Sequence, residues 1–147
     1  MGTLINKGQS LFEVVLVIGI TSVVLVAIVN AAILSVKSSS YSRNKTLATK
    51  YSQEAVEWLR GQRDAGWTEF SGKVNSTWCL KSLDWTIGRA CGASENIIGT
   101  AFKREADLTY GGDTKTINST VRVYWTDAQG YHDVKVNTFF SDWRESQ

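Results

Sequence analysis

One apolar run near the N-terminus constrains this chain more than any other feature. It extends from Leu11 to Leu34, and only one charged residue, Glu13, interrupts it. At about 1.5 Å per residue, a helix over this run crosses a hydrocarbon core of about 30 Å. A secretory signal peptide is the alternative, but the apolar region of such a peptide covers only roughly 7–15 residues. The run therefore predicts a single-pass transmembrane helix.

Composition limits what the rest of the chain can be. With 147 residues and part of them in a membrane, the chain has room for one small globular head. Its 16 Lys and Arg residues nearly balance 14 Asp and Glu residues, so charge gives no argument for nucleic acid as a partner. The sequence contains no proline, which permits one unusually long, uninterrupted helix.

Two features next to the apolar run point to a function. The preceding segment, residues 1–8, ends in Lys7-Gly8, and Glu13 lies just inside the run. An acidic side chain at the centre of a membrane helix costs about 2.5–3.5 kcal/mol, and less near an end. Glu13 is therefore a candidate functional residue, and the alternative is that its side chain only reaches the membrane interface.

The string K-G-Q-S-L-F-E-V-V-L-V-I-G-I resembles the class III signal of type IV pilins and type II secretion pseudopilins. The resemblance implies that prepilin peptidase cuts after Gly8 and methylates Gln9, the new N-terminal residue. It also implies that Glu13 neutralises the N-terminal ammonium of a neighbouring subunit, which lowers the cost of both charges in lipid. Family members most often have Phe in place of Gln9, and many carry a helix-kinking proline where this chain has Asn30.

The resemblance also implies a location and partners. The N-terminus would be cytoplasmic and the head would lie outside the inner membrane of a bacterium. The partners would be other pilin or pseudopilin subunits, prepilin peptidase and the inner-membrane assembly platform. The positive-inside rule taken alone favours the opposite orientation, because Lys37, Arg43, Lys45 and Lys50 follow the apolar run.

Beyond Leu34 the sequence becomes polar but remains compatible with a helix. Apolar residues recur every three or four positions and predict one buried stripe on a surface helix. Because glycine commonly ends helices, we expect the helix to end near Gly61 or Gly66. The stripe consists of Leu47, Tyr51, Ala55, Trp58 and Leu59. The predicted organisation is a leader over 1–8, a transmembrane half-helix over 9–35, an amphipathic half-helix over 36–64 and a head over 65–147.

The first part of the head, residues 65–99, shows no sustained period and is predicted to be an irregular loop with one short strand. It contains both cysteines, Cys79 and Cys91. Outside the cytoplasm these two should form a disulfide. Zinc is the alternative, but two cysteines with the only histidine, His132, far away in sequence make a poor ligand set.

The last third predicts an antiparallel sheet. Residues 102–108 alternate weakly and 121–125 strongly, and a turn over 127–130 leads into a returning strand over 132–140. The expected fold is α+β, with one long N-terminal helix packed on a small antiparallel sheet. The strings F-K-R-E, V-R-V-Y-W and G-Y-H-D-V-K-V-N-T are similar to the heads of minor pilins and minor pseudopilins.

No catalytic group can be named from the sequence. His132 lies in an alternating strand, which indicates a structural role, and Asp113 and Asp127 are typical turn residues. The alternative for these two aspartates, implied by the resemblance to pseudopilin heads, is that one of them binds calcium together with loop carbonyls. We therefore expect no enzyme, cofactor or metal site, and a structural subunit of a type IV pilus or pseudopilus filament. The alternative is a single-pass, signal-anchored extracytoplasmic domain that binds a ligand or acts as an enzyme.

Overall fold

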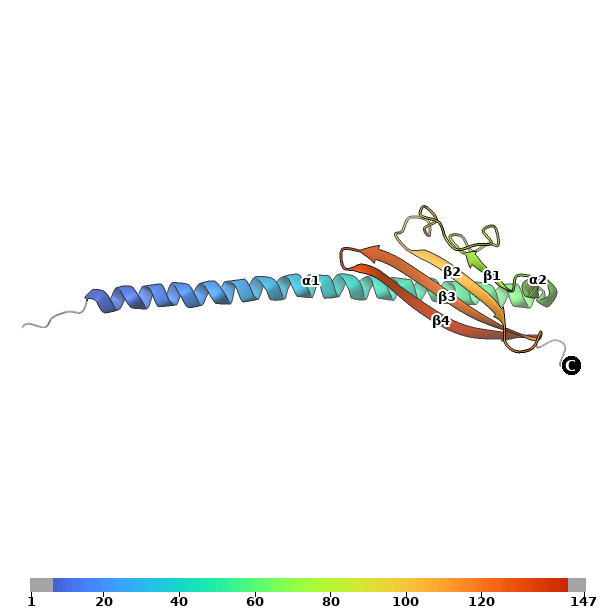
Figure 1. Ribbon diagram of the computed structural model, residues 1–147, viewed down its shortest axis with the longest axis horizontal. Coiled ribbons are helices and arrows are strands. Elements are labelled where there is room, and N and C mark those ends of the chain that lie inside the picture. The colour runs from blue at the N-terminus through green and yellow to red at the C-terminus, as the bar shows by residue number, and fades with distance from the viewer. Residues whose placement is uncertain (1–6, 143–147) are drawn as a thin grey trace, which may run out of the picture. The chain divides into compact units, whose positions relative to one another are not determined.

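The structure is a computed structural model that describes residues 7–142, with side chains from Leu11 onward. The chain separates into two compact units, Met1–Arg43 and Asn44–Gln147. Of the predicted leader, residues 1–6 lie outside the described part of the chain. Figure 1 shows the elements in chain order, beginning with helix α1.

Helix α1 extends from Lys7 to Ala65 without a break. No proline interrupts its hydrogen-bond ladder, which confirms the prediction of one long helix. It passes through Gly61, the earlier of the two predicted ends, and stops one residue before Gly66, the later one. A short helix, α2 (Trp67–Ser71), follows directly and was not predicted. Its five residues are too few to produce a helical period in the sequence.

The four strands of the second unit form one antiparallel sheet in the order β1-β2-β3-β4. Together with α1 they confirm the predicted α+β class (Figure 1). The short strand predicted within residues 65–99 is present as β1. Strand β3 begins at Thr116, five residues before Val121, where the predicted alternation starts. The strands are β1 (Ser76–Cys79), β2 (Lys103–Tyr110), β3 (Thr116–Asp127) and β4 (Gly130–Ser141).

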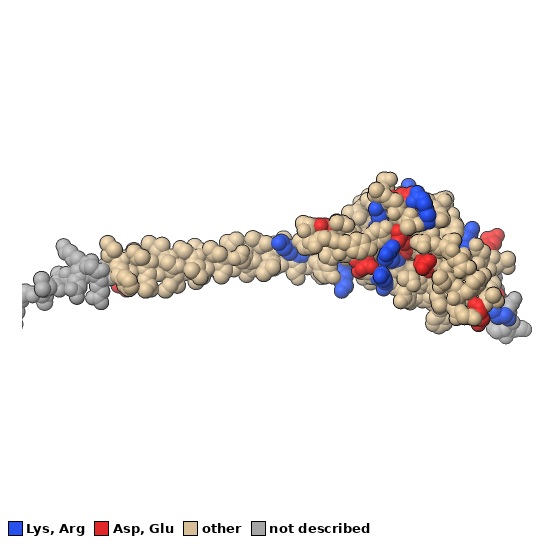
Figure 2. All heavy atoms as spheres, in the orientation of Figure 1, with Lys and Arg blue, Asp and Glu red and all other residues tan. Residues whose placement is uncertain are grey.

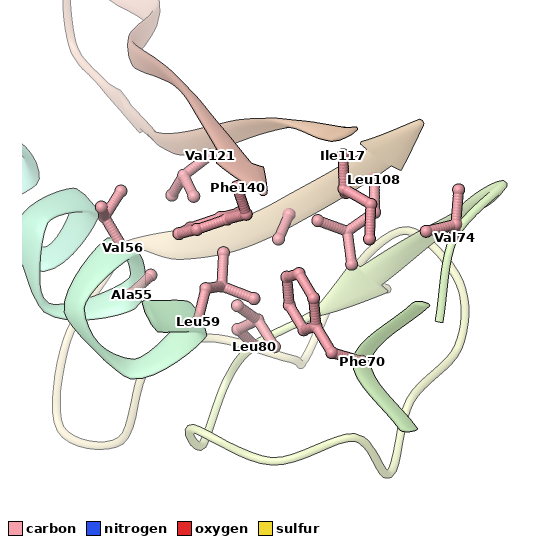
Figure 3. Close-up of a cluster of buried hydrophobic side chains, with 11 residues drawn as sticks. Ala55, Val56, Leu59, Phe70, Val74, Leu80, Leu108, Ile117, Val121 and Phe140 are labelled. Atoms are coloured by element: carbon pink, nitrogen blue, oxygen red, sulfur yellow. The ribbon is translucent and has the colours of Figure 1, made fainter. Parts of the chain in front are cut away.

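The core of the second unit lies between the amphipathic half of α1 and the inner face of the sheet. Ala55 and Leu59 of α1 are completely buried, as the apolar stripe predicted. They belong to one cluster with Phe70 of α2 and Phe140 of β4, whose rings meet edge to face with centroids 5.3 Å apart (Figure 3). A smaller cluster joins Ala48 to the strand residues Phe102, Val123 and Trp125.

Inward and outward residues alternate along β3 and β4, which gives the sheet two chemically different faces. On β3 the predicted inward residues Val121, Val123 and Trp125 are all buried. On β4 the inward residues from His132 to Phe140 are half-buried or buried, whereas the residues between them are exposed. The outer face of β3 and β4 is therefore polar and largely in contact with solvent, as expected for an antiparallel sheet that is covered on one side.

Candidate functional site

The start of α1 carries the predicted processing and assembly residues. Gly8 and Gln9 lie in its first turn, and their side chains are outside the described part of the chain. Glu13 is exposed, and its neighbours on the helix surface are Val14, Val17 and Ile18. Among the described residues Glu13 has no ion-pair or hydrogen-bond partner. A carboxylate on so apolar a surface needs a partner from another molecule or contact with water.

The surface around Glu13 is apolar and exposed along the helix. Its most apolar 18-residue window has a mean hydropathy of 2.8, and none of that window is buried. The hydroxyls of Thr21 and Ser22 donate to the carbonyl oxygens of Val17 and Ile18, so both polar groups are satisfied within the helix. Within residues 7–142, α1 is the one helix long and apolar enough to cross a membrane.

In the head, Cys79 and Cys91 form the predicted disulfide, with their Cα atoms 4.8 Å apart. Cys79 ends β1 and is buried, while Cys91 lies in the loop that connects β1 to β2. The zinc alternative is wrong, because both sulfurs are bonded to each other and His132 pairs with Asp127 at 2.9 Å. Among the described residues, no group of three or more His, Cys, Asp or Glu could hold a metal ion.

A buried carboxylate lies beneath this loop. Glu105 of β2 is 3% exposed and is the cross-strand neighbour of Cys79 on one side and Arg122 on the other. It accepts hydrogen bonds from the backbone N–H of Cys91 at 2.8 Å, from Arg122 Nη2 at 2.6 Å and from the Tyr124 hydroxyl at 2.8 Å. Glu105 therefore ties the disulfide loop to the outer face of the sheet.

These contacts set the charge state of Glu105. Burial disfavours the carboxylate and by itself would raise its pKa, but the hydrogen bonds from Arg122, Cys91 and Tyr124 outweigh burial. The pKa of Glu105 consequently lies below its ordinary value of 4.5. For Tyr124, burial and the adjacent carboxylate raise the pKa, so this phenol remains a donor at all ordinary pH values.

We expect the stability of the head to fall in acid because of Glu105. A depressed pKa in the folded state means that the stabilisation is complete above the ordinary value of 4.5 and disappears as the pH falls through the folded pKa. Urea unfolding between pH 7 and pH 3, followed by tryptophan fluorescence, measures this loss. In Glu105→Gln the loss of stability between pH 7 and pH 3 should be smaller. The exposed control Glu57→Gln should lose as much stability in acid as the unmodified protein. An equally steep loss in Glu105→Gln would contradict the assignment.

The residue before Glu105 is also buried, on the opposite face of the sheet. Arg104 is 3% exposed, and its Nε donates to the carbonyl oxygen of Leu80 at 3.0 Å. Its Nη1 donates to the carbonyl oxygen of Tyr51 at 3.1 Å and lies 3.5 Å from a carboxylate oxygen of Glu54. Burial lowers the pKa of Arg104, yet a guanidinium remains charged inside a protein. One side chain thus links α1, β2 and the disulfide loop.

Neither buried charge was predicted from the sequence. The segment Lys103-Arg104-Glu105 was correctly predicted to be strand, whereas Phe102 lies just before β2, and a strand places adjacent side chains on opposite faces. That alternation was the available signal, since an Arg-Glu pair inside a strand must send one charge toward the core. The partners are separated from Arg104 by 24 to 53 positions, so no local pattern could identify them.

The remaining predicted polar residues have structural roles. Asp113 accepts from the backbone N–H of Lys115, and Asp127 accepts from that of Gln129, as turn residues do. Asp127 also contacts His132 and the indole N–H of Trp125, which secures the turn between β3 and β4.

Compared with known proteins, the chain matches no protein-family model, no curated protein and no solved structure.

Proposed function

We propose that this chain is a structural subunit of a type IV pilus or type II secretion pseudopilus, most similar to the minor subunits of those filaments. In this proposal prepilin peptidase cuts after Gly8, and the mature protein joins the filament through α1. The observation that carries the proposal is the lone carboxylate of Glu13, without an ion-pair partner among the described residues, on an apolar helix and five residues after a Lys-Gly pair.

The chemistry of Glu13 supports a partner in another subunit. Cleavage after Gly8 creates an N-terminal ammonium four residues before Glu13 in the same helix. Each of these charges is costly in lipid, and pairing them between neighbouring subunits reduces the cost of both. Such a pair also sets the axial register of adjacent helices. The assembly platform of the inner membrane would supply the subunits.

The disulfide supports the proposed orientation. Disulfides persist in oxidising compartments and are rare in the bacterial cytosol. A head that holds the Cys79–Cys91 bond is therefore best accommodated outside the inner membrane, with the N-terminus inside. The four basic residues after the apolar run oppose this orientation, so peptidase processing, which requires a cytoplasmic leader, is the decisive property to measure.

Cleavage is the direct test. After co-expression with a prepilin peptidase, the intact mass of the protein is expected to fall by residues 1–8, with one added methyl group if Gln9 is methylated. Gly8→Phe should abolish this loss, because the peptidase requires a small residue at the cut. Gly19→Ala is the matched control, since a methyl group at Gly19 meets no atom within 4 Å. A chain that keeps its leader, or is cut after Leu34, would overturn the proposal.

A signal-anchored extracytoplasmic domain that binds a ligand or acts as an enzyme is the second candidate, because it too requires one helix long and apolar enough to cross a membrane. The two candidates differ in what they require of Glu13. For a filament subunit, Glu13→Gln should leave membrane insertion intact and lower the amount in sheared filaments at least about tenfold, the equivalent of about 1.4 kcal/mol. Ser22→Ala, in the same apolar helix, is the control. Equal incorporation of both variants would favour the anchored domain.

A further inference from the structure

The outer face of the sheet carries an uncharged group of side chains beside an exposed aromatic ring. Asn118 of β3 lies between Thr109 of β2 and Phe139 of β4 in the register of the sheet. Thr120 and Asn137 form the next cross-strand pair on the same face. These five residues are called the amide-hydroxyl patch below. All belong to the second unit of the chain.

The polar groups of the amide-hydroxyl patch are available to a ligand. Within residues 11–142, the side chains of Thr109, Asn118, Thr120 and Asn137 have no hydrogen-bond or ion-pair partner. The charged side chains nearest to the patch already have partners. Asp107, which lies opposite Thr120 in the register of the sheet, accepts from the Thr77 hydroxyl at 3.4 Å. Arg122 pairs with Glu105 at 2.6 Å, and Lys135 pairs with Asp133 at 3.5 Å. In Figure 2 the Lys, Arg, Asp and Glu atoms are spread over the head, with uncharged surface between them.

The patch is concave and has an apolar border. It lines a shallow hollow of about 440 Å³. Phe139 at its margin is 73% exposed, although burial of a Phe side chain stabilises a folded protein. A single exposed aromatic side chain can be accidental. Here it adjoins four polar side chains whose hydrogen-bonding capacity is unused, and that combination indicates a binding surface.

We propose that the amide-hydroxyl patch binds a neutral polysaccharide. Each hydroxyl of a sugar both donates and accepts, and Asn amides and Thr hydroxyls offer both functions without the cost of desolvating a charge. The ring of Phe139 can pack against the C–H face of a pyranose. An anionic polymer would need unpaired cations, and a protein partner would need more apolar surface than one aromatic ring. The inference does not depend on the filament function.

The test uses the full-length protein in phospholipid nanodiscs, because sugar-based detergents would compete for the patch. It measures retention on microcrystalline cellulose, chitin and insoluble starch, with polygalacturonate-coupled beads as the anionic comparison. We expect retention on at least one neutral polymer and none on polygalacturonate. Phe139→Ala and Asn118→Ala should each weaken binding about tenfold, as loss of a central contact does, and Phe139→Trp should preserve it.

Ile98→Ala is the matched control, because Ile98 lies on the loop before β2 and is 78% exposed, similar to Phe139. It should bind as the unmodified protein does. Three results would overturn the inference: no retention on any neutral polymer, equal retention on polygalacturonate, or equal weakening by Ile98→Ala and Phe139→Ala. Because leader cleavage does not involve the head, failure here leaves the filament proposal unaffected.

Discussion

Replacing Arg104 by alanine is expected to lower the free energy of unfolding of the head by about 3–5 kcal/mol. The substitution removes the donors to two main-chain carbonyl oxygens, those of Leu80 and Tyr51, and leaves a cavity at a position only 3% exposed. Glu54 contributes less to the effect, because it is partly solvated and can keep its charge in water. Urea unfolding of the full-length protein in micelles, followed by tryptophan fluorescence, measures the change.

Two further variants test the cause. Arg104→Lys retains the charge, but a single ammonium group cannot reproduce the planar fork that reaches both carbonyl oxygens, so most of the stability should still be lost. Arg60→Ala is the control, since Arg60 forms an exposed pair with Glu57 at 2.7 Å on the helix surface. Its effect should stay within about 0.5 kcal/mol. If Arg60→Ala and Arg104→Ala cost the same, the proposed role of burial is wrong.

Removal of the disulfide is the second large effect. The double variant Cys79→Ala/Cys91→Ala opens a loop closed over a sequence separation of 12 residues. The expected loss is about 3 kcal/mol, because the unfolded chain regains the freedom that the bond removes. Alanine is chosen because a serine hydroxyl at the buried Cys79 position would introduce an additional polar group. The midpoint of urea unfolding reports the loss.

Reduction provides the control for this prediction. A thiol reductant should destabilise the unmodified protein by a similar amount and leave the double variant unchanged. Because Glu105 still accepts from the backbone N–H of residue 91, the loop should remain partly attached in the double variant. Glu105→Gln combined with the double variant should therefore cost more than the sum of the separate effects. A double variant as stable as the unmodified protein would contradict the prediction.

Much of the fold was predictable because its signals are local. The apolar run from Leu11 predicts its helix by length. The absence of proline permits that helix to continue, and the later of the two predicted ends, Gly66, follows its last residue, Ala65. The alternation of Val121, Val123 and Trp125 predicts which side chains are buried. Helix α2 was not predictable in this way, because it contains little more than one turn and its position depends on Phe70 entering the core.

The candidate functional residues were likewise only partly predictable from the sequence. Gly8, Gln9 and Glu13 were found from sequence spacing alone, and their proposed roles still rest on that spacing together with the exposure of Glu13. The amide-hydroxyl patch could not be found in the same way. Asn118 and Phe139 are twenty-one positions apart in the sequence, and only strand register makes them neighbours.

What the sequence by itself determined is the set of elements and the residues that each element buries, because helix and strand periods repeat over a few positions. What only the tertiary structure decided is the pairing of groups from distant segments. Arg104 reaches Tyr51, and Glu105 reaches Cys91 and Arg122, because packing of the sheet on α1 and closure of the disulfide loop bring them within hydrogen-bonding distance. Hydrogen bonds act over about 3 Å, so their partners are a property of the folded chain and not of its local sequence.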